Sequence, residues 1–204
     1  MTFGDEKIKD FLGKVASPSP TPGGGTAAAF AGSLASALAE MVCNLTIGKE
    51  KYRDVEDEMV HEAKKCMEYR KKLMMLMDED ALAFNKVMEA FRIPKEEEGR
   101  GEAIQKAYKE AASVPLETAE VCLEVMKSAR KIAEKGNKNS ITDAGSSVML
   151  ANAAFHSAIF NVRINLSGIK DKEFVEQTRE KIAAMEEEIE RIMKEAMHIV
   201  EECL

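Results

Sequence analysis

The sequence predicts an all-α fold, a multihelical bundle in which two buried helices of small residues are wrapped by amphipathic helices. The 204-residue chain is rich in Ala, Glu, Lys, Leu and Met, which favour helices, and it contains only 5 prolines. It lacks the long alternation of Val, Ile and Thr that marks strands. Two segments, 26–47 and 143–166, are apolar or small on every side, which indicates burial on every side. No linker divides the chain, so we expect one domain over residues 1–204.

The hydrophobic period and the helix-breaking residues predict about seven helices, over residues 5–14, 26–47, 53–91, 102–113, 115–135, 143–166 and 172–204. The prolines between residues 17 and 23 exclude a helix there, and Thr26 is a suitable N-cap for the second helix. Gly48 ends that helix and Pro94 ends the third. Pro115 suits the first turn of a helix, so a break is expected just before it.

The last predicted helix has the clearest amphipathic pattern. Its apolar residues recur at alternating spacings of three and four, namely Ile182, Met185, Ile189, Ile192, Ala196, Ile199 and Cys203. Charged residues fill the other faces of this helix. A domain of this size rarely surrounds two fully apolar helices, so we expect the chain to self-associate, as a homodimer.

Charge and cysteine usage narrow the class of partner and the compartment. The net charge is −7, with 36 acidic and 29 basic residues, which gives no support to binding of nucleic acid or an anionic membrane. The 4 cysteines are dispersed without C-x-x-C spacing, which is typical of reduced thiols. The first ten residues lack the apolar core of a signal peptide. Two stretches without charge, 15–39 and 144–162, do not indicate transmembrane helices, because Pro and Gly interrupt the first and polar residues interrupt the second. We therefore expect a cytoplasmic protein with no membrane partner.

A glycine-rich loop precedes the second predicted helix. Gly23, Gly24 and Gly25 leave backbone N–H groups unshielded beside a helix N-terminus, where partial positive charge favours an anionic or polar ligand. The alternative is a turn that lets two backbones pack closely. Lys49, after the same helix, belongs to a small basic cluster that either meets an anionic group or is solvated surface charge.

Asp80 occupies an unusual place in the third predicted helix. The apolar stripe of this helix passes through Leu73 and Met77, continues at Asp80, and resumes at Phe84. An inward carboxylate is costly unless it is paired or protonated, and desolvation raises its pKa toward the range useful for acid–base catalysis. The alternative is that Asp80 pairs with a cation such as Arg70, or lies at the edge of the stripe.

Further short polar residues cluster around the sixth predicted helix. Asn139 and Asp143 belong to a polar loop before it, where a helix cap or a left-handed turn would explain one or two of them. Asn161 and Asn165 interrupt its apolar surface and require partners, which are a ligand, another helix or water. No set of His, Cys and carboxylate side chains has zinc spacing, and the glycine loop lacks the Lys of a P-loop. We therefore expect neither a metal nor a nucleotide cofactor.

These segments, in this order, resemble the cyclodeaminase/cyclohydrolase family of folate one-carbon enzymes. That family includes the C-terminal domain of formiminotransferase-cyclodeaminase and stand-alone methenyltetrahydrofolate cyclohydrolases. The resemblance covers nearly the whole chain, and its signatures are Pro22-Gly23-Gly24-Gly25-Thr26, Leu45-Thr46-Ile47-Gly48-Lys49, Asp78-Glu79-Asp80-Ala81, Ser113-Val114-Pro115-Leu116, the loop 136–143, and Asn161 with Ile164-Asn165-Leu166.

The resemblance implies an all-helical, self-associating enzyme that acts on a tetrahydrofolate adduct, with Asp80 as proton donor. The leading hypothesis is cyclodeamination of 5-formimidoyltetrahydrofolate to 5,10-methenyltetrahydrofolate and ammonia, with no cofactor besides the folate substrate. Asp143 and the Asn residues would orient the substrate, while the glycine loop, Thr26 and Lys49 would receive its polar or anionic parts. One alternative is a methenyltetrahydrofolate cyclohydrolase that gives 10-formyltetrahydrofolate. The other is a non-catalytic helical binding module.

Overall fold

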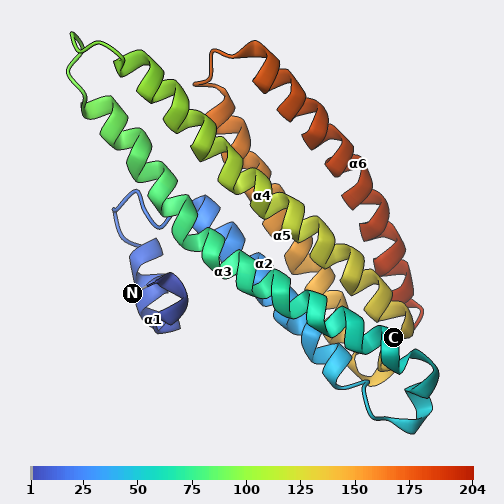
Figure 1. Ribbon diagram of the computed structural model, residues 1–204. Helices are drawn as coiled ribbons and strands as arrows, with labels where there is room; N and C mark the ends of the chain where they lie inside the picture. Colours follow the sequence, from blue (N-terminus) through green and yellow to red (C-terminus); the bar gives the residue numbers. More distant parts are fainter. Residues whose placement is uncertain (1) are drawn as a thin grey trace.

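A computed structural model describes residues 2–204, and within them it contains helices and no strand. The α-helices are α1 (Ile8–Val15), α2 (Gly24–Asn44), α3 (Glu56–Arg92), α4 (Arg100–Lys135), α5 (Ile141–Leu166) and α6 (Lys172–Glu201). Short 3-10 helices are η1 (Phe3–Asp5), η2 (Glu50–Val55) and η3 (Lys138–Ser140). The helices from α2 to α6 lie side by side in an elongated bundle, as Figure 1 shows, and this confirms the predicted all-α bundle.

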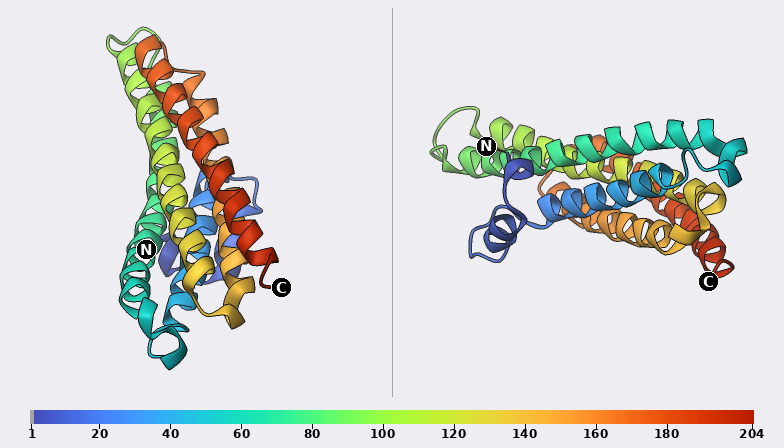
Figure 2. Two further views of the ribbon diagram at one scale, coloured as in Figure 1. Left: turned by 90° about the vertical axis from the view of Figure 1, so that its right-hand side faces the viewer. Right: turned by 90° about the horizontal axis from the view of Figure 1, so that it is seen from below.

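The core lies between the two small-residue helices and their amphipathic neighbours. α2 packs against α3, α4 and α5, while α6 covers α4 and α5 from the side opposite α3 (Figure 2). Phe155 of α5, Leu73 of α3 and Met126 of α4 are fully buried in this core. Alanines on α2 and α5 allow the backbones of these two helices to approach closely. The burial of α2 and α5 is not complete, however, because each keeps one face on the outside of the bundle.

α2 is long and apolar enough to span a membrane by length and composition, alone among the described helices. Within the bundle, however, 56% of its most apolar window is buried. That burial is what the core helix of a helical bundle requires.

Two predicted boundaries are wrong for identifiable reasons. α2 begins at Gly24 with Gly23 as its N-cap, so Thr26 lies in the first turn and is not the cap. α4 runs without a break through Pro115, where we expected two helices. A proline inside a helix leaves the carbonyl four residues earlier without its N–H partner. Here that carbonyl belongs to Ala111, and it accepts a hydrogen bond from Asn165 Nδ2 at 2.7 Å, which compensates for the loss.

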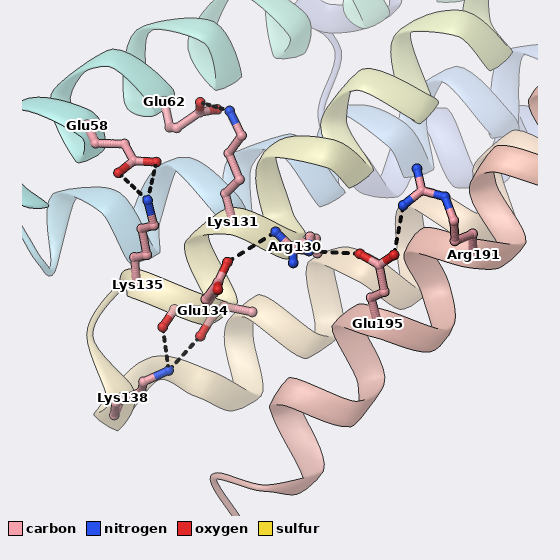
Figure 3. A network of polar contacts seen from close by, with 10 residues as sticks. Glu58, Glu62, Arg130, Lys131, Glu134, Lys135, Lys138, Arg191 and Glu195 are labelled. Carbon is pink, nitrogen blue, oxygen red and sulfur yellow. Dashed lines mark hydrogen bonds and ion pairs between the residues drawn. The ribbon is translucent and has the colours of Figure 1, made fainter.

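The end of the bundle where α4 passes into α5 is held by a polar network. Figure 3 shows Lys138 reaching back to the carbonyls of Ala133 and Glu134, each at 2.8 Å, where it caps the C-terminus of α4. In the same view Lys131 meets Glu62, a carboxylate that is only 1% exposed. α5 begins at Ile141, two residues earlier than predicted.

Candidate functional site

Asp80 points from α3 toward the first turn of α2. Its Oδ2 atom accepts a hydrogen bond from the Thr26 hydroxyl at 2.8 Å, and the backbone N–H of Thr26 also donates to the carboxyl group. The carboxyl therefore lies at a helix N-terminus, where the free N–H groups of α2 stabilise negative charge. Arg70, the alternative partner, pairs with Glu40 at 3.0 Å instead, so the expectation of a structural ion pair with Asp80 is wrong.

The glycine loop makes this approach possible. A Cβ atom added to Gly25 would lie 2.2 Å from Asp80 Oδ1, a distance at which the two atoms overlap. A Cβ on Gly24 would lie 3.2 Å from Asn161 Nδ2, which is tight but less severe. Close packing therefore accounts for Gly25, and the partner in that packing is the carboxyl group singled out by the apolar stripe.

The environment of Asp80 changes its acidity. Burial raises the pKa of Asp80 above its ordinary value, and the hydrogen bonds from Thr26 offset part of that shift. A carboxyl group with a raised pKa holds and releases a proton nearer neutral pH than an exposed one. Asp80 is thus equipped to act as an acid or as a base.

A cavity of about 460 Å³ opens beside Asp80. This volume is within the range of small-molecule sites. Its walls come from the glycine loop, α3, α4 and α5, through Pro20, Thr21, Gly23, Gly24, Gly25, Asp80, Phe84, Val87, Met88, Phe91, Tyr108, Ala111, Asn161, Ile164, Asn165 and Ser167. A larger groove of about 1040 Å³ lies between α3 and α4, but none of the predicted site residues lines it.

Two predicted site residues on α5 line the Asp80 cavity with their amide groups. Asn161 Nδ2 donates to the carbonyl of Ser157 at 2.8 Å, and Asn165 Nδ2 donates to the carbonyls of Ala111 and Asn161. For Asn165 the alternative of satisfaction by another helix is therefore confirmed. Asn165 Nδ2 uses both of its N–H groups on backbone carbonyls, which leaves the side-chain oxygen for a ligand, whereas Asn161 keeps one N–H group as well as its oxygen.

The structure does not bring every predicted site residue to this cavity. Gly23, Gly24, Gly25, Thr26, Asp80, Asn161 and Asn165 gather at one end of the bundle. Lys49 and Asn139 are exposed at the other end, close to the start of α5, where Asp143 is half-buried. Asp143 and Asn161 are both on α5, and at about 1.5 Å per residue they lie about 27 Å apart.

The cavity also has an aromatic wall that the sequence analysis did not identify as functional. The rings of Phe91 and Tyr108 meet edge to face with centroids 5.9 Å apart, and Phe84 lines the same cavity. Phe84 and Phe91 share the apolar stripe with Asp80, so their side of α3 was available as a signal. Tyr108 could not be identified in this way, because its place in the cavity wall depends on packing against Gly168, which is distant in sequence.

The fold and the site together define a class: helical-bundle proteins that hold a buried carboxyl group of raised pKa beside a partly apolar pocket. The sequence model of the formiminotransferase-cyclodeaminase family matches residues 7–184, so the chain belongs to that family. This match confirms the resemblance found in its motifs. It is thereby a member of a family of folate one-carbon enzymes.

The similar proteins include both cyclohydrolases and cyclodeaminases. A methenyltetrahydrofolate cyclohydrolase from Methylorubrum extorquens is 45% identical over 178 residues, which are 85% of this chain and 86% of that protein. The formimidoyltransferase-cyclodeaminase of Mus musculus is 30% identical over 90% of this chain but only 35% of its own length. The crystal structure of a formiminotetrahydrofolate cyclodeaminase from Thermotoga maritima superposes with a TM-score of 0.91 and 38% identity over 97% of both chains.

Proposed function

We propose that this protein is a methenyltetrahydrofolate cyclohydrolase, which uses water to open 5,10-methenyltetrahydrofolate to 10-formyltetrahydrofolate. The observation that carries the proposal is the Asp80 carboxyl group, held by Thr26 at the edge of the cavity. The Methylorubrum extorquens relative supports the reaction, because the similarity extends over most of both chains. This choice reverses the order in which the sequence analysis placed the two folate reactions.

Asp80 would serve this reaction first as a base and then as an acid. A water molecule attacks the methenyl carbon and gives a proton to the Asp80 carboxylate. The bond from that carbon to N5 then breaks, and N5 takes the proton from Asp80. Loss of the hydroxyl proton to solvent leaves a formyl group on N10, so one water is consumed and one proton released. The proposed steps need positioning and proton transfer, with the folate as substrate and no further cofactor.

The remaining residues of the cavity would position the substrate. The rings of Phe91 and Tyr108 offer an apolar wall for a flat bicyclic ring. The amide oxygens of Asn161 and Asn165 would accept hydrogen bonds from N–H groups of that ring. The loop from Gly23 to Gly25 and Thr26 would bring the positive end of α2 to polar parts of the substrate.

A second candidate is the cyclodeaminase reaction, which the similarity to the Thermotoga maritima enzyme supports. In that reaction N10 attacks the formimidoyl carbon on N5, and a protonated Asp80 gives its proton to the departing ammonia. The same cavity would serve, with Asp80 entering as an acid. The non-catalytic binding module has lost its support, because the family contains named enzymes.

We also propose that the enzyme works as a cytoplasmic homodimer. The uncharged outer sides of α2 and α5 are the surface on which two copies would meet. Sedimentation of the purified protein at assay concentration tests this part, and a monomer with full activity would contradict it.

The experiment that tests the reaction follows the near-ultraviolet absorbance of the methenyl chromophore, for wild type and for Asp80→Asn. Faster decay of methenyltetrahydrofolate with wild type than with the variant supports the cyclohydrolase. Growth of the chromophore from 5-formimidoyltetrahydrofolate, lost in the variant, supports the cyclodeaminase instead. No response above the uncatalysed rate with either compound would reject both reactions.

A further inference from the structure

Pro115 lies near the middle of α4, where a proline is unfavourable. α4 continues through it, and the side chain is buried. A proline inside a helix removes one backbone hydrogen bond and crowds the preceding turn, so it works against helix formation. A residue that violates a local preference in this way is expected where a functional site requires it. Pro115 is therefore a candidate for a role in the site and not only in the fold.

The backbone carbonyl that Pro115 leaves free lies in the wall of the Asp80 cavity. It belongs to Ala111 of α4, and Ala111 lines the cavity together with Asn165 of α5. Asn165 Nδ2 donates to this carbonyl at 2.7 Å and to the carbonyl of Asn161 at 2.9 Å. Because Pro115 has no N–H to hold the Ala111 carbonyl along the helix axis, that carbonyl can turn toward the neighbouring helix and accept from the side.

These two hydrogen bonds fix the orientation of the Asn165 amide group. A backbone carbonyl only accepts, so the NH2 group of Asn165, and not its oxygen, must face Ala111 and Asn161. Both N–H groups are then in use, and the Oδ1 atom points away from the two carbonyls. Within residues 2–204 no group donates to this oxygen, and the protein does not seal it from solvent. The oxygen therefore opens onto the cavity that Asn165 lines.

A purely structural role for Asn165 leaves its oxygen unexplained. A single donor is enough to satisfy the Ala111 carbonyl, and a hydroxyl group would supply it. An amide brings an additional acceptor to the contact between two helices, and that acceptor requires a partner of its own. A ligand in the cavity that carries an N–H group is such a partner.

We infer that Pro115 is a positioning residue, which fixes the Asn165 amide through the Ala111 carbonyl so that Asn165 offers only an acceptor to an N–H group of the substrate. Pro115 itself is not among the residues that line the cavity, so it acts through Asn165. This inference rests on the proposed function, in which the bicyclic ring of the folate supplies the N–H group. A fixed amide loses little freedom when the substrate binds, and it rejects a ring with an acceptor at that position.

The wall that carries Asn165 is also held by contacts that do not involve Pro115. Gln105 of α4 donates from Nε2 to the carbonyl of Gly168 at 3.0 Å, and its Oε1 atom accepts from the N–H of Lys170 at 2.7 Å. Gly168 packs against the ring of Tyr108, where a Cβ atom would lie 2.6 Å from Cζ. A substitution at position 115 should therefore change the amide and leave the wall in place.

Pro115→Ala tests the inference, because it restores the missing N–H, which competes with Asn165 for the Ala111 carbonyl. We expect KM to rise about 2–10-fold with kcat nearly unchanged, since one neutral hydrogen bond is lost from substrate binding. The α-hydroxy analogue of alanine at position 115 lacks the proline ring too, but its ester has no N–H, so it should rescue KM. An unchanged KM in Pro115→Ala, or an equal rise with the ester, would overturn the inference.

A double variant tests whether Pro115 acts through Asn165. In an Asn165→Leu background, which already lacks the amide, Pro115→Ala should have no further effect on KM. If the two substitutions raise KM independently, Pro115 does not act through Asn165 and the inference fails.

Hydrogen exchange of the Asn165 side-chain amide reports on its orientation without any substrate. In isotope-labelled protein the resonances of this NH2 group are identified by their loss in Asn165→Leu. Their exchange with solvent should be slow in wild type and faster in Pro115→Ala, while Gly101→Ala, which favours the same helix elsewhere, should leave it slow. Equal exchange in wild type and Pro115→Ala would overturn the inference. If wild type acts on neither folate, the proposed function fails, and the exchange rates still decide whether Pro115 holds Asn165.

Discussion

The hydroxyl of Thr26 and the carboxyl of Asp80 meet at 2.8 Å although 54 residues separate them in the chain. This contact joins the first turn of α2 to the middle of α3. It exists because α2 begins at Gly24, two residues before the threonine that the sequence suggested as its cap. Thr26 is therefore free to hold the carboxyl group at the positive end of a helix.

Replacement of Asp80 by Asn should abolish catalysis and preserve the fold. We expect folate turnover to fall by about 10²–10⁴-fold, because the amide neither accepts nor donates the reacting proton. Because burial raises the pKa of Asp80, its ionised form destabilises the folded state. Protonated Asp80 thus stabilises the fold below the unfolded pKa of about 3.9, and this contribution is lost as pH rises through the folded pKa.

The Asn variant should therefore gain stability relative to wild type as pH rises. Urea unfolding at several pH values measures the difference. A variant that loses about 3 kcal/mol at neutral pH would show instead that Asp80 is part of a structural ion pair.

Replacement of Thr26 by Val removes the hydroxyl donor and nearly keeps the shape. Because that hydrogen bond lowers the pKa of Asp80, its loss should raise the pKa further. If Asp80 acts as a base, the acidic limb of the pH–rate profile should move to higher pH. Thr26→Ser should keep the acidic limb at its wild-type position. A pH–rate profile that is unchanged in Thr26→Val would show that Thr26 has no influence on the proton transfer.

Gly25→Ala should damage activity through geometry alone. The new methyl group would lie 2.2 Å from Asp80 Oδ1 and would displace the carboxyl group. A displacement of about 1 Å can cost about 10²-fold in rate. Gly101→Ala is the matched control, since a Cβ there meets nothing within 4 Å and alanine favours the helix. Steady-state kinetics of both variants measure the effect, and equal activities would refute it.

Glu62 should matter for stability and not for catalysis. It is 1% exposed and accepts hydrogen bonds from Ser128 at 2.6 Å and Lys131 at 3.1 Å. Burial alone would raise the pKa of Glu62, but these hydrogen bonds hold it below its ordinary value. Glu62→Gln should lose about 2–3 kcal/mol of unfolding free energy, since the lysines are partly exposed, with turnover unchanged.

The pH dependence of that loss has a definite sign. A lowered pKa means that Glu62 stabilises the fold above its unfolded pKa of about 4.3, and the contribution is lost as pH falls through the folded pKa. The gap between wild type and Glu62→Gln in urea should therefore narrow on acidification. A gap that widens would contradict the assignment.

The thiols should divide sharply in reactivity. Cys43, Cys66 and Cys122 are buried, and desolvation raises the pKa of each to about 12, while Cys203 is exposed. Native protein should therefore react with an aromatic disulfide at Cys203 only, and the buried thiols should react after unfolding. Fast reaction of a second thiol in native protein would show that the core opens.

Local patterns were enough to predict most of the fold, because the long helices differ clearly in their apolar periodicity. The break at Pro115 was predicted wrongly for a reason that no local pattern contains. The carbonyl that Pro115 leaves free, on Ala111, is satisfied by Asn165 from another helix. A proline is a reliable helix boundary only when nothing distant replaces the missing hydrogen bond.

In the candidate site, too, local patterns identified some residues, while others depended on contacts between distant parts of the chain. Asp80 could be found from a single stripe, since a carboxylate in an apolar row is anomalous within its own helix. The hydrogen bond from Thr26 to Asp80 could not be predicted, because it depends on the residue at which α2 starts. Lys49 and Asp143 stay predictions, because they lie at the other end of the bundle from Asp80, and that distance follows from the helix lengths and not from any motif.

The separation between Glu62 and Asp80 has a practical consequence for engineering. Both are on α3, and their 18-residue spacing places them about 27 Å apart, beyond the range at which substitutions usually interact. Thermostabilising substitutions can therefore be collected around the Glu62 end by directed evolution and combined additively. The substrate preference of the Asp80 end can be altered in a parallel campaign, and the two sets merged without repeated rescreening.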